Sequence, residues 1–212
     1  MRCNQLIAIY KIRTVGILAV ALLLNACVNQ PSVPQDYFYR LPELHPSVPH
    51  QQTLINGLLL VDELQADGVY RERPLLYVDG QRPLEVVQYH YRHWVQTPSQ
   101  IIQDNLLEYL REANVADKVE RYTSGNSPDL LITGRLQKFE QFVQQTGSTA
   151  VVAMEIEFRK KTPQGTVKES REYETKVMAD GSSIHDSVIA FGNALQQIYD
   201  KILADLDTMV FK

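Results

Sequence analysis

The chain has 212 residues, of which 44% are hydrophobic and 22% are charged, so it is long enough for one sizeable domain with its own core. It holds 21 Lys and Arg residues against 25 Asp and Glu residues, which gives a formal net charge of −4 at pH 7. Because phosphate binding needs a basic surface, this acidic balance argues against nucleic acid as a partner.

The first residues have the character of an export signal. Arg2, Lys11 and Arg13 supply positive charge, and no acidic residue occurs before position 27. Residues 14–24 then form an apolar run, about half as long as the ~20 residues that a membrane-spanning helix needs. We therefore predict a cleaved signal peptide over residues 1–26.

A cysteine follows the apolar run directly. Cys27 is preceded by Ala26 and, three positions before it, by Leu24, which resembles the lipobox of bacterial lipoproteins. The other cysteine, Cys3, would leave with the signal, so Cys27 would have no disulfide partner. We predict lipid on Cys27; the alternative is a free thiol after an ordinary secretory signal or an uncleaved anchor.

The residue after the cysteine bears on which membrane is involved. In Gram-negative lipoproteins an aspartate at this position commonly marks retention in the inner membrane, and this chain has Val28. We therefore predict an outer-membrane lipoprotein whose domain faces the periplasm. Cleavage would leave 18 basic against 25 acidic residues, so lipid and not charge would hold the chain to an anionic membrane.

A proline-rich stretch separates the predicted lipidation site from the domain. Residues 27–52 contain five of the ten prolines, which favours an extended tether before a domain over residues 53–212. Its segment 37–42 is too aromatic for a simple linker, and we expect it to dock on the domain as a first strand. The alternative is an exposed aromatic patch that binds lipid or a partner.

The first half of the domain alternates strands with a helix. Residues 58–64 predict a buried central strand, and residues 74–78 predict a second strand that folds back on residues 84–95 as a hairpin. At Thr97, a Thr-x-x-Gln capping box with Pro98 at the first helical position predicts a helix that continues to about Glu112. Its buried face comprises Ile102, Leu106, Tyr109 and Leu110.

The second half predicts a meander and a last helix. After a short strand over residues 119–122, strands are expected over residues 130–139, 150–160 and 167–177. A helix begins near Ser183, and its apolar stripe comprises Ile184, Val188, Phe191, Leu195, Ile198, Ile202 and Leu206. This order predicts an α+β fold, with an antiparallel or mixed sheet and two main helices packed on one face.

Several of these features occur together in one family. The chain resembles the ABC-type transport auxiliary lipoprotein family in its lipobox cysteine, the aromatic-aromatic-x-Leu-Pro element at residues 38–42, and residues 73–77 before the hairpin. Trp94 before Thr97 and Pro98, the meander and the C-terminal helix complete the resemblance. PqiC-like members of this family are outer-membrane partners of MCE-type lipid transport proteins. The resemblance implies an accessory docking module with an MCE-type partner and no catalytic site.

Residues that could carry chemistry have simpler explanations. No nucleophile elbow, Walker A loop, dinucleotide-binding glycine motif or H-E-x-x-H motif occurs. His90 and His93 are three apart on a predicted strand and would face opposite sides, unlike metal ligands. His185 lies at a helix start, and Glu155 and Glu157 suit a solvated sheet face. We predict no enzyme, no cofactor and no metal.

The candidate partner-binding residues are Phe38, Tyr39 and Trp94. Trp94 is most simply a core residue, and the alternative is an interface anchor, because tryptophan is enriched at binding hot spots. The heptad-like stripe of the last helix also leaves a homo-oligomer open. Two other functions stay open: a structural or regulatory lipoprotein that activates an envelope enzyme, and a hydrolase without a recognisable motif.

Overall fold

The computed structural model describes residues 33–210. The predicted signal peptide and Cys27 lie outside these residues, so both stay predictions. The compact unit that contains the sheet and helices begins at Asp36. Within the described range, no helix combines the length and the apolar character needed to cross a membrane.

One long strand, β7 (Leu130–Gln144), organises a nine-stranded mixed sheet. Three short strands lie in series along one edge of β7 and run parallel to it. They are β2 (Ile55–Val61), β3 (Gln65–Ala66) and β4 (Pro74–Asp79). Leu59 and Leu60 of β2 are fully buried, as predicted for a central strand.

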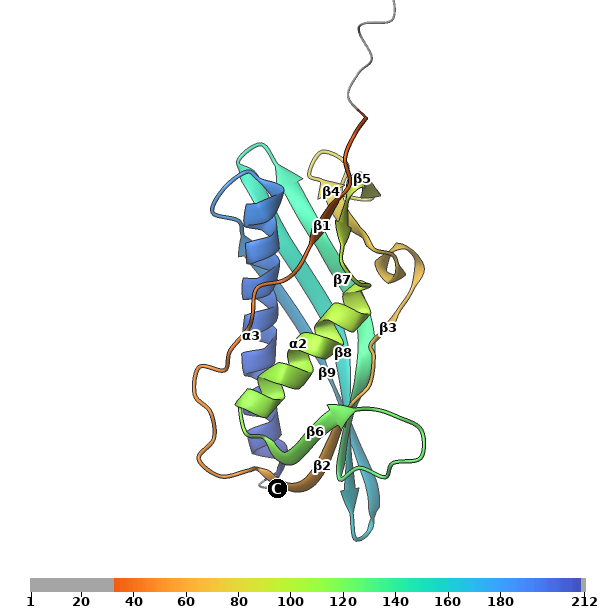
Figure 1. Cartoon of the computed structure of the whole chain (residues 1–212), viewed down its shortest axis with the longest axis vertical. Helices are drawn as coiled ribbons and strands as arrows, with labels where there is room; N and C mark the ends of the chain where they lie inside the picture. The colour runs from red at the N-terminus through yellow and green to blue at the C-terminus, as the bar shows by residue number, and fades with distance from the viewer. Residues whose placement is uncertain (1–32, 211–212) are drawn as a thin grey trace, which may run out of the picture. The chain divides into compact units, whose positions relative to one another are not determined.

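The remaining strands extend the sheet in both directions (Figure 1). On the other edge of β7, β8 (Gly147–Thr162) and then β9 (Gly165–Met178) form the predicted antiparallel meander. β6 (Ala116–Arg121) pairs with β2, and β5 (Val86–Trp94) forms the predicted hairpin with β4. β1 (Tyr37–Tyr39) pairs with β5 in parallel, which confirms the expected docking of the aromatic segment.

The meander strands are longer than the sequence pattern predicts. Pairing of β7 with β8 continues as far as Gln144 and Gly147, which leaves two residues in the turn. The predicted strands 130–139 and 150–160 leave ten residues between them. Backbone hydrogen bonds extend the hairpin because Gly147 adopts a φ of 138°, which favours glycine at this position.

Two helices cover one face of the sheet, so the predicted α+β class is confirmed. α2 (Pro98–Glu112) begins with the complete capping box at Thr97, and its four predicted core residues are buried. α3 (Ile184–Val210) begins where the Ser183 hydroxyl and the Asp186 carboxylate cap each other's backbone N–H groups. From Val188 onward the predicted stripe is buried against the meander.

A segment that we name the strap, residues 40–54, crosses α3 after β1 and then passes the carboxyl end of α2 (Figure 1). Pro42 lies against Gly192 of α3, and the His45 carbonyl accepts a hydrogen bond from the Gln196 side chain at 2.8 Å. The His45 ring also bonds the Glu112 carboxylate at 2.7 Å, which raises the pKa of the imidazole. Much of the proline-rich stretch therefore lies on the domain, and an extended tether stays a prediction only for the residues before Asp36.

The contact between Pro42 and Gly192 gives a stability prediction. A Cβ at position 192 would overlap the Pro42 ring, so Gly192→Ala should lower the free energy of unfolding by about 1–2 kcal/mol, after the helix-propensity gain of alanine. In a Pro42→Ala background the same change should be neutral or stabilising. Urea unfolding monitored through the single tryptophan measures both; a stabilising Gly192→Ala with Pro42 present would contradict the packing.

Candidate functional site

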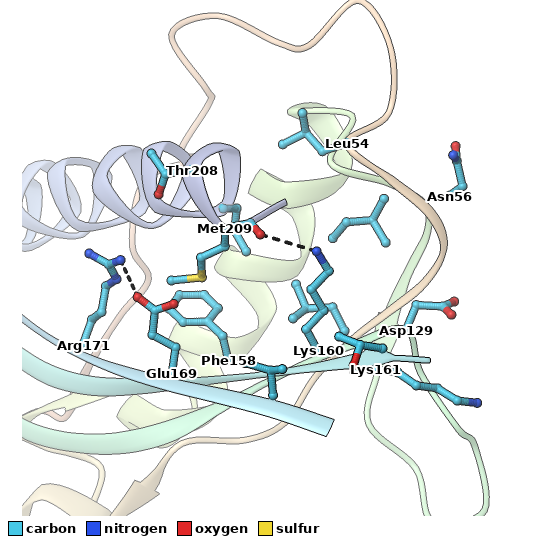
Figure 2. Close-up of a pocket in the computed structure, with 15 residues that line it drawn as sticks. Leu54, Asn56, Asp129, Phe158, Lys160, Lys161, Glu169, Arg171, Thr208 and Met209 are labelled. Carbon is cyan, nitrogen blue, oxygen red and sulfur yellow. Dashed lines mark hydrogen bonds and ion pairs between the residues drawn. The ribbon is translucent and has the colours of Figure 1, made fainter. Parts of the chain in front are cut away.

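A pocket with a cavity volume of about 540 Å³ opens beside the carboxyl end of α3 (Figure 2). Its walls come from the start of β2, the start of β7, the facing ends of β8 and β9, and the last turns of α3. These elements meet because the start of β7 pairs with the end of β8, and the end of β8 pairs with the start of β9. In Figure 1 this is the lower end of the sheet, whereas β1 enters the upper half.

The inner wall of the pocket is apolar. Leu130, Phe158 and Leu206 contribute to it, and each is at most 3% exposed. Met209 and Leu54 are half-buried nearer the mouth. An apolar group that entered would contact carbon on several sides, which is the usual construction of a small-molecule pocket.

A lysine interrupts the apolar side chains on this face of β8. Phe158 and Lys160 share the helix-facing side of the strand, because side chains two apart point the same way. The Lys160 ammonium donates to the Met209 carbonyl at 3.4 Å. In Figure 2 this side chain turns inward, whereas the neighbouring Lys161 points away from the cavity.

An arginine network closes one side of the pocket. Arg171 bonds Glu169 at 2.5 Å and Asp205 at 3.1 Å, and the hydrogen bond to Glu169 raises the pKa of the guanidinium. The Tyr173 hydroxyl donates to Asp205 at 2.6 Å, and burial raises the pKa of that phenol. The Arg171 Nε–H group is buried and has no hydrogen-bond acceptor in the described part of the chain.

The predicted partner-binding residue Phe38 lies on an exposed surface that we name the aromatic edge, made of Tyr37, Phe38, Arg73 and Arg92. The Phe38 side chain is 55% exposed, and the Arg73 guanidinium lies 5.3 Å from its ring centre. The Arg92 guanidinium carbon lies 4.1 Å from the centre of the Tyr37 ring. The Tyr39 hydroxyl accepts a hydrogen bond from Arg92, and Tyr39 packs partly on the core.

Trp94, the third candidate, is a core residue. It is 1% exposed, and its ring centre lies 5.2 Å from Phe139 and 5.5 Å from Phe191. It therefore offers a partner no surface. Simple alternation groups Trp94 with polar residues of β5, but the pairing with β4 shifts register between Pro74 and Leu76, so alternation does not hold along this strand.

The remaining candidates stay apart or have structural partners. His93 lies 3.5 Å from Asp36, whereas His90 is exposed, and no group of three potential metal ligands occurs among residues 33–210. Asp186 caps α3, and Glu157 forms an ion pair with Arg159. The pocket was not predicted from the sequence. The local signal for it is Lys160, a charged residue that follows the apolar residues on one face of β8.

Comparison with known proteins adds a family and a fold. The chain matches the model of the ABC-type transport auxiliary lipoprotein component over residues 39–203. A crystal structure from Xanthomonas campestris, assigned to the family model DUF330, is similar with a TM-score of 0.67 and 16% identity, covering 82% of this chain and 95% of that one. Another crystal structure, of an uncharacterized protein, has a TM-score of 0.63 and 12% identity, covering 82% and 99%. No curated protein sequence matches the chain.

Proposed function

The chain belongs to the ABC-type transport auxiliary lipoprotein family, and on this premise we propose that it docks an MCE-type lipid transport protein at the outer membrane. In this role lipid on Cys27 anchors the chain, and the domain faces the periplasm. The observation that carries the proposal is the family match, which spans the strap, the sheet and most of α3. The role is one of binding, without catalysis.

The position of β1 supports a docking surface close to the membrane. Tyr37 follows Cys27 by ten residues, and a fully extended link of that length reaches at most ~35 Å. A lipid route must deliver near the bilayer, because each acyl methylene exposed to water costs about 0.8 kcal/mol. A partner bound at the aromatic edge would therefore lie close to the membrane in which the lipid on Cys27 is inserted.

The chemistry of the aromatic edge also suits a protein partner. Phe38 offers an exposed ring, and exposed Arg and aromatic side chains are enriched at the centres of protein interfaces. β1 has β5 as its single strand partner among the described strands, so its other edge leaves backbone groups free to pair. We propose that Phe38 and Tyr39 belong to the partner-binding surface.

The anchor is tested by Cys27→Ala. This variant should lose its lipid and move from the membrane to the soluble periplasmic fraction, because an acidic domain has little attraction of its own for an anionic surface. The domain should stay folded, with unchanged unfolding in urea. Fractionation and genetic complementation measure the outcome; full function from the detached variant would show that membrane placement is dispensable.

The docking surface is tested by site-specific photo-crosslinking in cells. A photoreactive residue at Phe38 should capture an MCE-type transport component. The matched control is Leu84, which is 97% exposed in the turn between β4 and β5, outside the aromatic edge, and which should capture far less. Capture of an envelope enzyme instead would favour the regulatory alternative, and equal capture from both positions would remove the aromatic edge from the proposal.

A further inference from the structure

We infer that the pocket beside the carboxyl end of α3 binds the acyl chain of a single-chain anionic amphiphile, such as a fatty acid or a lysophospholipid, with the headgroup at Lys160. This site lies away from the aromatic edge, and the inference does not depend on the identity of the docking partner. It rests on the shape and lining of the pocket and on the unusual position of one cation.

The dimensions suit one flexible chain. A cavity of about 540 Å³ falls within the range of roughly 300–1,000 Å³ that is usual for small-molecule sites. The deep side is formed by Leu130, Phe158 and Leu206, which are almost fully buried, and the mouth includes Val167, which is 56% exposed. A linear apolar chain can therefore enter at the exposed rim and lie against a preformed carbon surface.

Lys160 supplies the headgroup contact. On β8 the helix-facing positions Val152, Met154, Ile156 and Phe158 are at most 2% exposed, and Lys160 is the next residue on that face. An ammonium carries three N–H donors, of which the long bond to the Met209 carbonyl accounts for one. Among residues 33–210 no carboxylate pairs with Lys160 within 4.0 Å, so its charge is available to an anion at the pocket mouth.

The acidic groups around the pocket are already engaged. Asp129 accepts the Leu58 backbone N–H at 2.8 Å, and Glu169 is bound by Arg171. A carboxylate or phosphate at the pocket mouth therefore meets ammonium donors of Lys160 that the described protein groups leave unused.

Most of the backbone around the pocket is already paired, which favours an amphiphile over a peptide. A bound peptide would need main-chain partners, but β7 and β8 are paired on this stretch, and the free strand edge at the pocket is the outer edge of β9. The Asp129 and Lys161 N–H groups likewise bond to main-chain oxygens. A ligand with one apolar chain and one charged end needs only the carbon surface and Lys160.

The test is displacement of a fluorescent fatty acid from the full chain carrying Cys27→Ala, purified without detergent. Palmitate and lysophosphatidylglycerol should displace the probe, and lysophosphatidylcholine should do so more weakly because its headgroup has no net charge. Inorganic phosphate alone should have no effect. The ligand that displaces the probe at the lower concentration, palmitate or lysophosphatidylglycerol, carries the anionic headgroup that the site prefers.

Paired lysine variants locate the binding. Lys160→Gln should weaken palmitate binding at least tenfold, whereas the control Lys161→Gln removes a neighbouring charge that points away and should leave it unchanged. Trp94 fluorescence checks that both variants are folded, since this ring is 1% exposed. Equal affinities for the two variants, competition by phosphate alone, or tighter binding of an apolar peptide than of palmitate would each overturn the inference.

Discussion

Continuous pairing along β7 is the interaction on which the rest of the structure depends. One edge of this strand holds β2, β3 and β4 in succession, and the other holds β8 along its whole length. β4 and β7 are parallel neighbours, so the chain must return to the start of the sheet between them, and α2 lies in this connection. Gly134 allows the close approach of β8, because a side chain there would overlap the Glu155 backbone.

The strap ties the N-terminal end of the domain to the same core. Pro42 and Leu44 pack on α3, while the His50 N–H group bonds to the Ala113 carbonyl just after α2. The strap therefore contacts both helices, which also bond each other through Tyr109 and Asp200, and it leads from β1 at the edge of the sheet.

Local patterns in the sequence were sufficient for the elements but not for their long-range arrangement. The capping box at Thr97 and the alternation along β8 depend on neighbouring residues, so both could be predicted. The core position of Trp94 was also predicted, but its packing on Phe139 and Phe191 and the parallel pairing of β1 with β5 depend on residues distant in sequence. The pocket could not be predicted, because its walls come from the starts of β2 and β7, the meander and the end of α3.

The family and the placement of β1 support an adaptor that is held at a membrane and binds a transport partner. Purification of the native lipidated chain from solubilised envelopes, with mass-spectrometric identification of what accompanies it, tests this claim most directly. The account predicts enrichment of an MCE-type transport component that is lost in a mock purification. Enrichment of an envelope enzyme without any transport component would contradict it.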